Sequence, residues 1–352
     1  MYSVDLAADP VLRGLGWFPQ YYVSQNRTRV GRLRFNLLRD PRQLQDHQAL
    51  VYWGDFQNNA LWALESYFDR ERRLHGVLDP AEALVNWQSL YLPDPDQLPD
   101  GMRVVAAGGC FLGLQGALTE RPELAKASAR FLQRCDAVIV RDTGSLRALQ
   151  RLGQNYDLEL RGLNLGFDCA SLADWPAPSR WRGGWFAHAF GRGLPPGDAA
   201  RLVVEVERVT GLRGISIDWL IQRRPRRLSD LGFRWHRRLM RHTRFCLTDT
   251  YHFAINAMGL GSLPIMIGRA AGPSLSTLNE AKKQILYAMT RLDEAHLRLP
   301  GEAHTAAAPC VLRETAERIG KLAAGLAGDP GWRDGFLYCR ARMARHLAEV
   351  LA

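Results

Sequence analysis

The sequence lacks the features of a secreted, disulfide-stapled or membrane-spanning protein. Its six cysteines, at positions 110, 135, 169, 246, 310 and 339, contain no CxxC pair. A chain of 352 residues can also build a core without such staples, so we expect neither disulfides nor a zinc site. The first residues lack the basic-then-apolar order of a signal peptide, and no apolar run reaches the ~18 residues of a transmembrane helix. These absences predict a cytoplasmic protein.

Acidic residues are in the minority, with 36 against 46 lysines and arginines, and the formal net charge is +10. This excess favours anionic partners, which include phosphorylated small molecules, acidic lipid headgroups and nucleic acid. Hydrophobic residues make up 47% of the chain, as in an ordinary globular protein. A chain of 352 residues usually exceeds one hydrophobic core, so we expect two domains.

Apolar runs alternate with longer amphipathic segments, which is the pattern of parallel strands covered by helices. Strands are expected at 48–53, 102–109, 137–140, 185–190, 245–248 and 263–268. Helices are expected at 60–74, 122–135, 145–149, 198–211 and 251–261, and in the tail from about 311. The two prolines and the glycine pair in 169–184 predict an interdomain linker. We therefore predict an α/β fold with two Rossmann-like domains, 1–172 and 173–352, that face each other across a cleft.

The segment FCLTDTYHFAINAMGLGSLPIMI, residues 245–267, carries the strongest functional signal. An apolar strand ends before Asp249, and a helix begins near Tyr251 and His252. A helix start attracts anions through its free N–H groups and its dipole, and ligands of doubly wound folds bind at the carboxyl edge of the sheet. His252 would then donate to a phosphate or act as a general acid. Alternatively, Asp249 or Thr250 only caps the helix, and His252 is a buried core histidine.

A similar strand–turn–helix arrangement occurs in VIVRDTGSLRALQRLG, residues 138–153. The planar guanidinium of Arg141 would suit a carboxylate or a phosphate. Alternatively, the helix is simply capped, and Arg141 pairs with Asp142 or with another neighbour.

Glycine turns follow several of the expected strands, at Gly54, at 108–109 and at 191–193. None fits the dinucleotide-binding or P-loop patterns, so ordinary βα turns explain them equally well. Asp55 and Asn58 carry side chains suited to sugar hydroxyls, and Arg192 would place a cation at the mouth of the second domain.

The basic stretch 221–244 contains nine arginines and one acid. Leu228, Leu231, Trp235, Leu239 and His242 fall at helical spacing, which predicts that they pack inward while the arginines face outward. That outer face is either a solvated surface, a surface that meets anionic lipid or a polyanionic acceptor, or a nucleic-acid contact. No nucleic-acid-binding module accompanies it, so we expect no nucleic acid, whereas peripheral contact with an anionic membrane stays open.

A further helix is expected at 276–289. Ser276 or Thr277 would cap it, and Glu280 would complete a capping box. Lys282 and Lys283 are ordinary surface lysines unless one of them reaches an anion in the cleft.

Taken together, these segments resemble the polysaccharide pyruvyl transferase family over about residues 46–290. The resemblance rests on WGDFQNN, GGCFLG, VIVRDTGSLRALQRLG, LNLGFDCA and TDTYHFAINAMGLGSLPIMIG. The family has two Rossmann-like domains arranged as in GT-B glycosyltransferases. Its usual Arg-Leu-His triplet is matched here at His252, but Thr250 stands where the family arginine would be. Arg244, Arg141 or Arg269 would have to replace that arginine.

The resemblance implies transfer of a pyruvyl group from phosphoenolpyruvate to sugar hydroxyls of a polysaccharide or of its lipid-linked precursor. A ketal forms and phosphate leaves; no metal and no cofactor other than this donor substrate are implied. The donor methylene must be protonated, for which the resemblance implies His252, with Asp55 acting on the acceptor hydroxyl. The acceptor would be bound by Asn58 and Asn59. The donor would be bound by Arg141, Arg192, Arg244, Thr250, Tyr251 and Lys282.

Two other functions remain open. A GT-B glycosyltransferase that uses a nucleotide sugar would need an acidic residue for the ribose, and Glu280 is the one offered after Ile267. A non-catalytic protein of the same fold is the third reading, because of Thr250.

Overall fold

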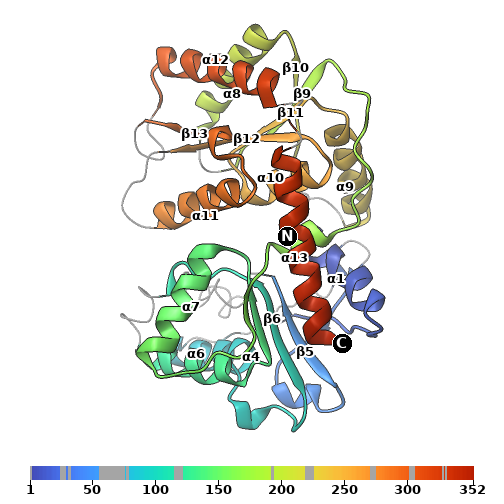
Figure 1. The fold of residues 1–352 in the computed structure, drawn as a ribbon, viewed down its shortest axis with the longest axis vertical. Helices are drawn as coiled ribbons and strands as arrows, with labels where there is room; N and C mark the ends of the chain where they lie inside the picture. Colours follow the sequence, from blue (N-terminus) through green and yellow to red (C-terminus); the bar gives the residue numbers. More distant parts are fainter. Residues whose placement is uncertain are drawn as a thin grey trace. The chain divides into compact units, whose positions relative to one another are not determined.

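The computed structural model describes most of the chain as two compact units (Figure 1). Residues 2–172 and 340–352 form the N-terminal unit, and residues 173–339 form the C-terminal unit. The described residues are 2–23, 29–30, 33–54, 76, 79–114, 122–191, 194–218, 226–269, 275–300, 306–326, 329 and 331–352.

The N-terminal unit is built on a parallel sheet in the order β5-β6-β7-β8. Its strands are β5 (Ala49–Trp53), β6 (Arg103–Gly109), β7 (Ala137–Val140) and β8 (Leu163–Leu165). Four short strands form two small sheets, namely β1 (Tyr22–Val23) with β4 (Asn36–Leu37), and β2 (Arg29–Val30) with β3 (Leu33–Arg34). The helices are α1 (Tyr2–Gly14), α4 (Pro80–Tyr91), α6 (Pro122–Arg134) and α7 (Thr143–Asn155), with 3-10 turns η1 (Pro41–Leu44), η2 (Pro95–Gln97) and η3 (Cys169–Leu172).

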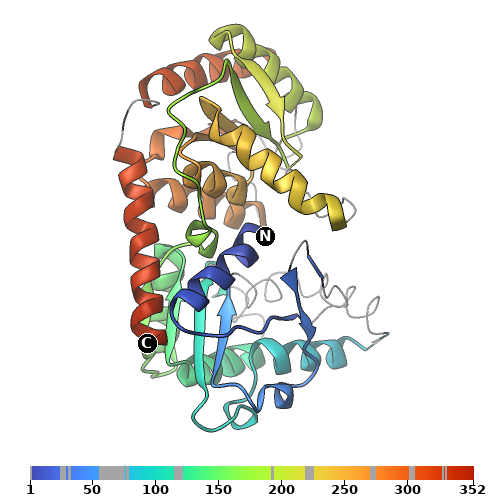
Figure 2. The same ribbon diagram turned by 90° about the vertical axis from the view of Figure 1, so that its right-hand side faces the viewer.

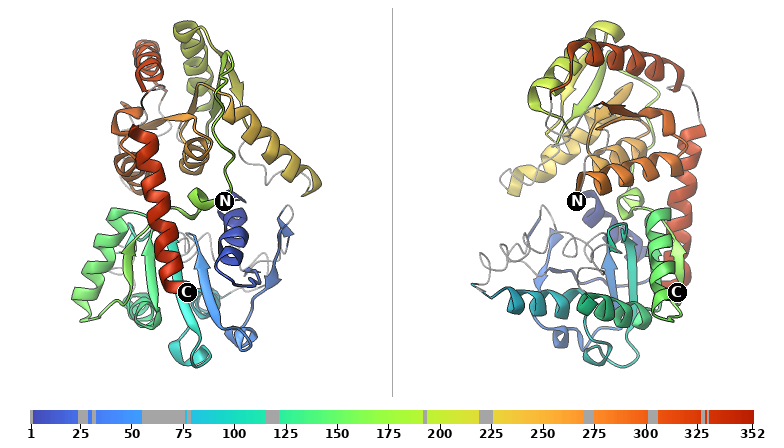
Figure 3. Two further views of the ribbon diagram at one scale, coloured as in Figure 1. Left: turned by 45° about the vertical axis from the view of Figure 1, so that its right-hand side comes forward. Right: turned by 90° about the vertical axis from the view of Figure 1, so that its left-hand side faces the viewer.

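Helices cover both faces of this first sheet. Successive strands lie side by side, so right-handed crossovers place α4, α6 and α7 on one face, as Figure 1 shows. The other face is covered by α1 and by the last turns of α13 (Gly331–Leu351) (Figure 3). Arg103 of β6 donates to Val350 O (2.8 Å), and Trp17 donates to Leu351 O (2.9 Å). These contacts explain why residues 340–352 lie with the N-terminal unit, whereas the sequence pattern assigns the whole tail to the second domain.

The C-terminal unit contains a five-stranded parallel sheet in the order β10-β9-β11-β12-β13. Its strands are β9 (Trp185–Ala189), β10 (Arg213–Ser216), β11 (Phe245–Thr248), β12 (Leu263–Arg269) and β13 (His296–Leu299). Its helices are α8 (Pro196–Thr210), α9 (Arg226–Arg241), α10 (Tyr251–Gly259), α11 (Leu275–Met289) and α12 (Pro309–Leu326), with the 3-10 turn η5 (Asp293–Ala295).

The strand order of this second sheet reverses once. The chain moves from β9 outward to β10 and then returns past β9 to β11, after which it continues in one direction. Right-handed crossovers therefore place helices on both faces: α8 and α12 cover one face, and α9, α10 and α11 cover the other (Figure 2). The predicted fold class is confirmed, because each unit is an α/β structure on a parallel sheet. The facing of the two units across a cleft stays a prediction.

Residues 169–184 are predicted to link the two domains, and the two units divide inside this range, after residue 172. Residues 169–172 form η3, and the residues after them pack on the ends of α9 and α10. Arg182 donates to Arg241 O and Thr243 O (both 3.0 Å) and to Gly261 O (2.7 Å). A helix end leaves carbonyl groups without intrahelical partners, and one guanidinium satisfies several of them here.

The packing face of α9 also differs from the sequence expectation. The buried side chains are Phe233, His236 and Met240, whereas Leu231 and Trp235 are 62% and 58% exposed. On a neighbouring part of the helix surface, Arg237 donates to Asp174 O, and Arg241 donates to Ala177 O (2.7 Å). These two arginines face the protein because the segment after η3 offers them backbone carbonyls. The predicted apolar face is therefore turned outward.

None of the helices within the described ranges is both long and apolar enough to cross a bilayer.

We predict that Arg182→Gln lowers the free energy of unfolding by about 2 kcal/mol, because several carbonyls lose a charged donor. Arg182→Lys should recover only part of this loss, since an ammonium cannot reproduce the planar fork. Urea unfolding measures both changes. The exposed Arg180 gives a matched control, and Arg180→Gln should change the stability by less than ~0.5 kcal/mol. Equal losses in the two glutamine variants would refute the role of Arg182.

Candidate functional site

The strand order of the second sheet reverses between β9 and β11, whose carboxyl ends lie side by side. Loops that follow these two strands leave for opposite faces of the sheet, and this is where ligands of doubly wound folds bind. Two hydrogen bonds join the strand ends: Thr248 Oγ1 donates to Ala189 O (2.7 Å), and Gly191 N donates to Asp249 Oδ1 (2.6 Å). We take this switch point as the candidate site.

The start of α10 lies at the switch point, as the sequence predicts. Thr250 occupies the N-cap, but its hydroxyl donates to Asp249 Oδ1 (3.0 Å) instead of capping the helix. The backbone N–H of Thr250 donates to Thr248 Oγ1 (2.9 Å). Asp249 is buried and accepts from both Gly191 and Thr250, so it holds the loop after β9 against the start of α10.

His252 and Tyr251 occupy the first turn of α10, and both side chains are half-buried. Their rings meet edge to face, with centroids 5.3 Å apart. His252 is therefore partly accessible to solvent. An imidazole at the positive end of a helix can donate a hydrogen bond to an anion. Its catalytic role stays a prediction.

A second histidine near this edge was not predicted from the sequence. His188 lies one residue before the end of β9 and is half-buried. Burial lowers the pKa of His188 below its usual value, against the opposing effect of the Glu207 carboxylate. At neutral pH the ring is therefore uncharged. The signal available in the sequence was one polar residue inside the apolar strand WFAHA.

Two buried cations at the carboxyl side of this sheet are paired with carboxylates. Arg269, at the end of β12, contacts Asp198 Oδ2 at 3.0 Å, and Asp198 also accepts from Ala307 N (2.8 Å). Arg269 therefore ties β12 to the first turn of α8. It is 4% exposed and cannot replace the family arginine without giving up this pair.

Lys283 and Glu280 of α11 form the second pair, with Nζ and Oε1 2.5 Å apart, and His296 Nε2 lies 3.5 Å from Glu280 Oε2. Burial would raise the pKa of Glu280, but His296 and Lys283 hold it below its usual value. The predicted capping box is wrong, because α11 begins at Leu275, before Ser276, and Glu280 is paired further along the helix. The ribose role offered for Glu280 would have to compete with this pair.

The other cations expected near the donor are spread over the chain. Arg244 is exposed and precedes β11, so it lies at the amino end of that strand, away from Thr250 and His252. Lys282 is half-buried in α11, one residue before the paired Lys283. Arg192 lies outside the described residues. The structure thus separates Arg244 from the start of α10, which corrects its expected part in the same site.

Arg141 lies in the N-terminal unit and is 2% exposed. Its guanidinium contacts two carboxylates, Asp168 at 3.5 Å and Asp142 at 3.7 Å. Asp142 also accepts from Ser145 N (2.7 Å) as the N-cap of α7, so the alternative of a capped helix with a paired arginine describes this geometry. A donor-binding role for Arg141 stays a prediction.

The acceptor-side residues Asp55, Asn58 and Asn59 lie outside the described residues. The strand ends beside them are tightly packed. Gly108 has φ +76°, and an added Cβ would lie 2.5 Å from Cys169 Sγ. Position 108 therefore needs glycine because Cys169 packs against it, and this need does not indicate a bound ligand.

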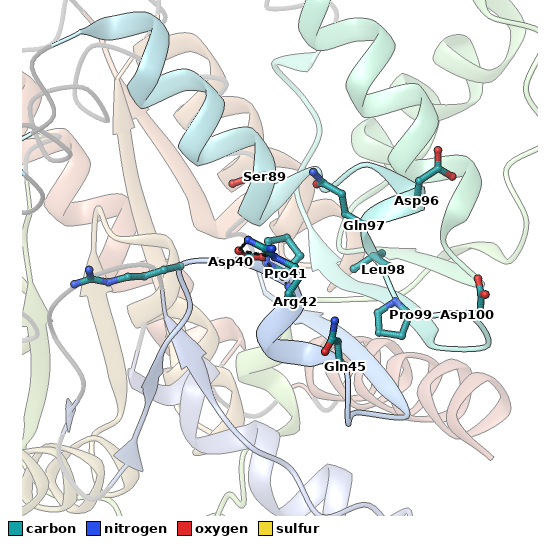
Figure 4. A pocket seen from close by; sticks show the side chains of 11 residues that line it. Asp40, Pro41, Arg42, Gln45, Ser89, Asp96, Gln97, Leu98, Pro99 and Asp100 are labelled. Carbon is teal, nitrogen blue, oxygen red and sulfur yellow. Dashed lines mark hydrogen bonds and ion pairs between the residues drawn. The ribbon is translucent and has the colours of Figure 1, made fainter.

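A polar hollow of about 650 Å³ lies elsewhere in the N-terminal unit (Figure 4). It is lined by residues that precede β5 and β6, among them Gln45 and Pro99, and by the exposed pair Asp40–Arg42. These residues lie at the amino edge of the first sheet, which is the edge where open parallel sheets do not usually bind ligands. We do not assign function to it. Among the described residues, no three His, Cys, Asp or Glu side chains are grouped to hold a metal ion.

No protein-family model and no curated protein sequence matches the chain. Solved structures that match the chain include two glycosyltransferases. Arabidopsis thaliana UGT89C1 complexed with UDP-L-rhamnose has a TM-score of 0.47 and 12% identity, with 100% of this chain and 95% of that chain covered. Phytolacca americana apo UGT2 has a TM-score of 0.43 and 11% identity, with 90% and 86% covered. At TM-scores below 0.5 these likenesses carry no argument, and the fold class rests on the strand order of this chain.

We predict that Arg141→Met lowers the free energy of unfolding by about 3–5 kcal/mol, because it leaves two carboxylates buried without their cation. Arg141→Met combined with Asp168→Asn should recover part of that loss in urea unfolding. A donor-binding Arg141 would behave otherwise: the single variant would keep its stability, and the second substitution would restore nothing.

Proposed function

We propose that the chain is a transferase whose phosphate-bearing donor binds at the switch point of the C-terminal unit. This proposal is supported by the hydrogen bonds of Asp249, which accepts from Gly191 in the loop after β9 and from Thr250 at the start of α10 and so holds the two together. The first N–H groups of α10 would bind the phosphate, and the helix dipole would favour its charge.

Of the two donors considered, a nucleotide sugar fits the described side chains better. Phosphoenolpyruvate carries a carboxylate and a phosphate, and such a compact polyanion calls for cationic forks. Arg269 and Lys283, the buried cations described at this side, are already paired with Asp198 and Glu280. The start of α10 offers backbone N–H groups, a hydroxyl and an imidazole, which can bind a diphosphate as neutral donors.

In glycosyl transfer, an acceptor hydroxyl attacks the anomeric carbon while the bond to the diphosphate oxygen breaks. Negative charge develops on the leaving diphosphate, and the N-terminus of α10 would stabilise it. His252 would donate a hydrogen bond to that diphosphate, or a proton as charge develops. A base must take the proton of the acceptor hydroxyl, and Asp55 is the sequence prediction for it. The acceptor would be a saccharide.

Pyruvyl transfer from phosphoenolpyruvate is the second candidate, supported by the half-buried imidazole at the helix start. In that reaction His252 would protonate the donor methylene, and one sugar hydroxyl would add to the resulting cationic carbon and lose its proton to a base. Phosphate would then leave, and a second sugar hydroxyl would add to the same carbon and lose its proton, which closes the ketal. Both reactions need the same anion site, so the donor can be decided by binding.

We predict that uridine diphosphate stabilises the purified chain against thermal unfolding more than phosphoenolpyruvate does at equal concentration. Other nucleoside diphosphates should be measured beside it, because the base is not specified by the site. Greater stabilisation by phosphoenolpyruvate would select pyruvyl transfer. No stabilisation by any of these anions would refute the donor site.

His252→Ala should weaken the binding of the stabilising anion about 10-fold or more, because a hydrogen bond to a charged group is lost. Turnover should fall further, because the general acid is also lost. Isothermal titration measures the first effect. His346, on α13 beside Glu349, provides the control, and His346→Ala should bind the anion as the unsubstituted chain does. Unchanged binding in His252→Ala would remove the histidine from the site.

A further inference from the structure

One face of α9 presents apolar and basic side chains together. Leu231, Arg234, Trp235 and Arg238 are all exposed and follow one another at helical spacing. With 3.6 residues per turn they fall within an arc of ~100° on the helix surface. Phe233, His236 and Met240 lie on the opposite side and are buried. We call the four exposed residues the outer stripe of α9.

A third large apolar side chain lies beside the end of this stripe. Trp181 is 60% exposed, and its ring lies 5.3 Å from the ring of His242, which directly follows α9. His242 falls on the same side of the helix as Trp235 and Arg238, because it lies seven and four positions further along. The outer stripe and Trp181 therefore form one surface. Figure 1 shows α9 at the edge of its helix layer.

The arginines of the stripe differ from the other arginines of α9. Arg237 and Arg241 are bound to backbone carbonyls of the segment after η3, and Arg237 also lies 4.8 Å above the ring of Trp175. Arg234 and Arg238 are exposed instead, so a partner outside the chain can reach their charges.

We propose that the outer stripe of α9, together with Trp181, docks on an anionic lipid surface. Tryptophan is favoured at the boundary between headgroups and acyl chains, because its ring is apolar and its N–H is polar. Leucine adds apolar area that enters the same boundary. The two arginines attract acidic headgroups, and their aliphatic stems can lie along the apolar layer while the guanidinium groups reach the phosphates.

Charge complementarity decides for lipid over a second copy of this chain. The chain carries a formal net charge of +10, so two such surfaces would repel each other through their arginines. An anionic bilayer offers both the negative charge and the apolar layer that the stripe needs. This inference concerns α9 and does not rest on the proposed donor site.

The test is sedimentation of the full chain with vesicles of phosphatidylcholine, with and without phosphatidylglycerol. We expect binding to the mixed vesicles only, weakened by salt. Arg234→Gln with Arg238→Gln should reduce the partition coefficient about 10-fold or more, since each basic residue near such a surface contributes about fivefold. The matched control is Arg313→Gln with Arg318→Gln, two exposed residues of α12 on the other face of the sheet. This control variant should lose much less vesicle binding than the Arg234/Arg238 variant.

The apolar contribution is tested separately. Leu231→Ser with Trp235→Ser should also reduce vesicle binding, whereas Val204→Ser, at a position 61% exposed on α8, should not. Circular dichroism checks that each variant is folded. The proposal is overturned if the unsubstituted chain ignores the mixed vesicles, or if both arginine pairs lose binding equally. It is also overturned if the chain is dimeric in sedimentation velocity and the Leu231/Trp235 variant is monomeric, because the stripe would then be a protein interface.

Discussion

Parallel strands have to be joined by crossovers, and the right-handedness of those crossovers governs the C-terminal unit. Because β10 lies on one side of β9 and β11 on the other, α8 and α9 must cover opposite faces. The loops after β9 and β11 then leave for opposite faces of the sheet. Asp249 joins them by accepting from Gly191 and Thr250. The position of the candidate site is thus a consequence of strand order, and one buried carboxylate organises its chemistry.

The buried cations within the described ranges are held in ion pairs. Arg141 with two aspartates, Arg269 with Asp198 and Lys283 with Glu280 each compensate the cost of removing a charge from water. Arg141 with Asp168 and Arg269 with Asp198 also join elements that are distant along the chain, whereas Lys283 and Glu280 pair within α11. If such a cation bound a ligand instead, its carboxylate would be left buried without a counter-charge, which would destabilise the fold. This is why the start of α10, which binds anions through backbone groups, is the better candidate for the donor.

The apolar strands were largely predictable, because a buried parallel strand is a continuous apolar run. The expected strands 137–140 and 245–248 match β7 and β11, and 102–109 differs from β6 by one residue. The short strands β8, β10 and β13 were not predicted, since LNL, RGIS and HLRL contain polar residues and no clear period. The helix start at His252 was predictable from the apolar strand that precedes it. The Asp198–Arg269 pair was not predictable, because 71 positions separate its two members.

The helix α9 shows why a pattern of spacing does not decide which face is buried. Leu231 and Trp235 have the spacing of a packing face, and arginines are ordinarily placed on the solvated face. Here the segment after η3 presents backbone carbonyl groups to α9. Arginine side chains can donate hydrogen bonds to these carbonyls and apolar side chains cannot, so Arg237 and Arg241 face this segment. Satisfying those carbonyls turns the helix so that Leu231 and Trp235 face outward. The cost of exposing them is recovered only where another apolar layer covers them, and the neighbouring arginines favour a layer with negative charge.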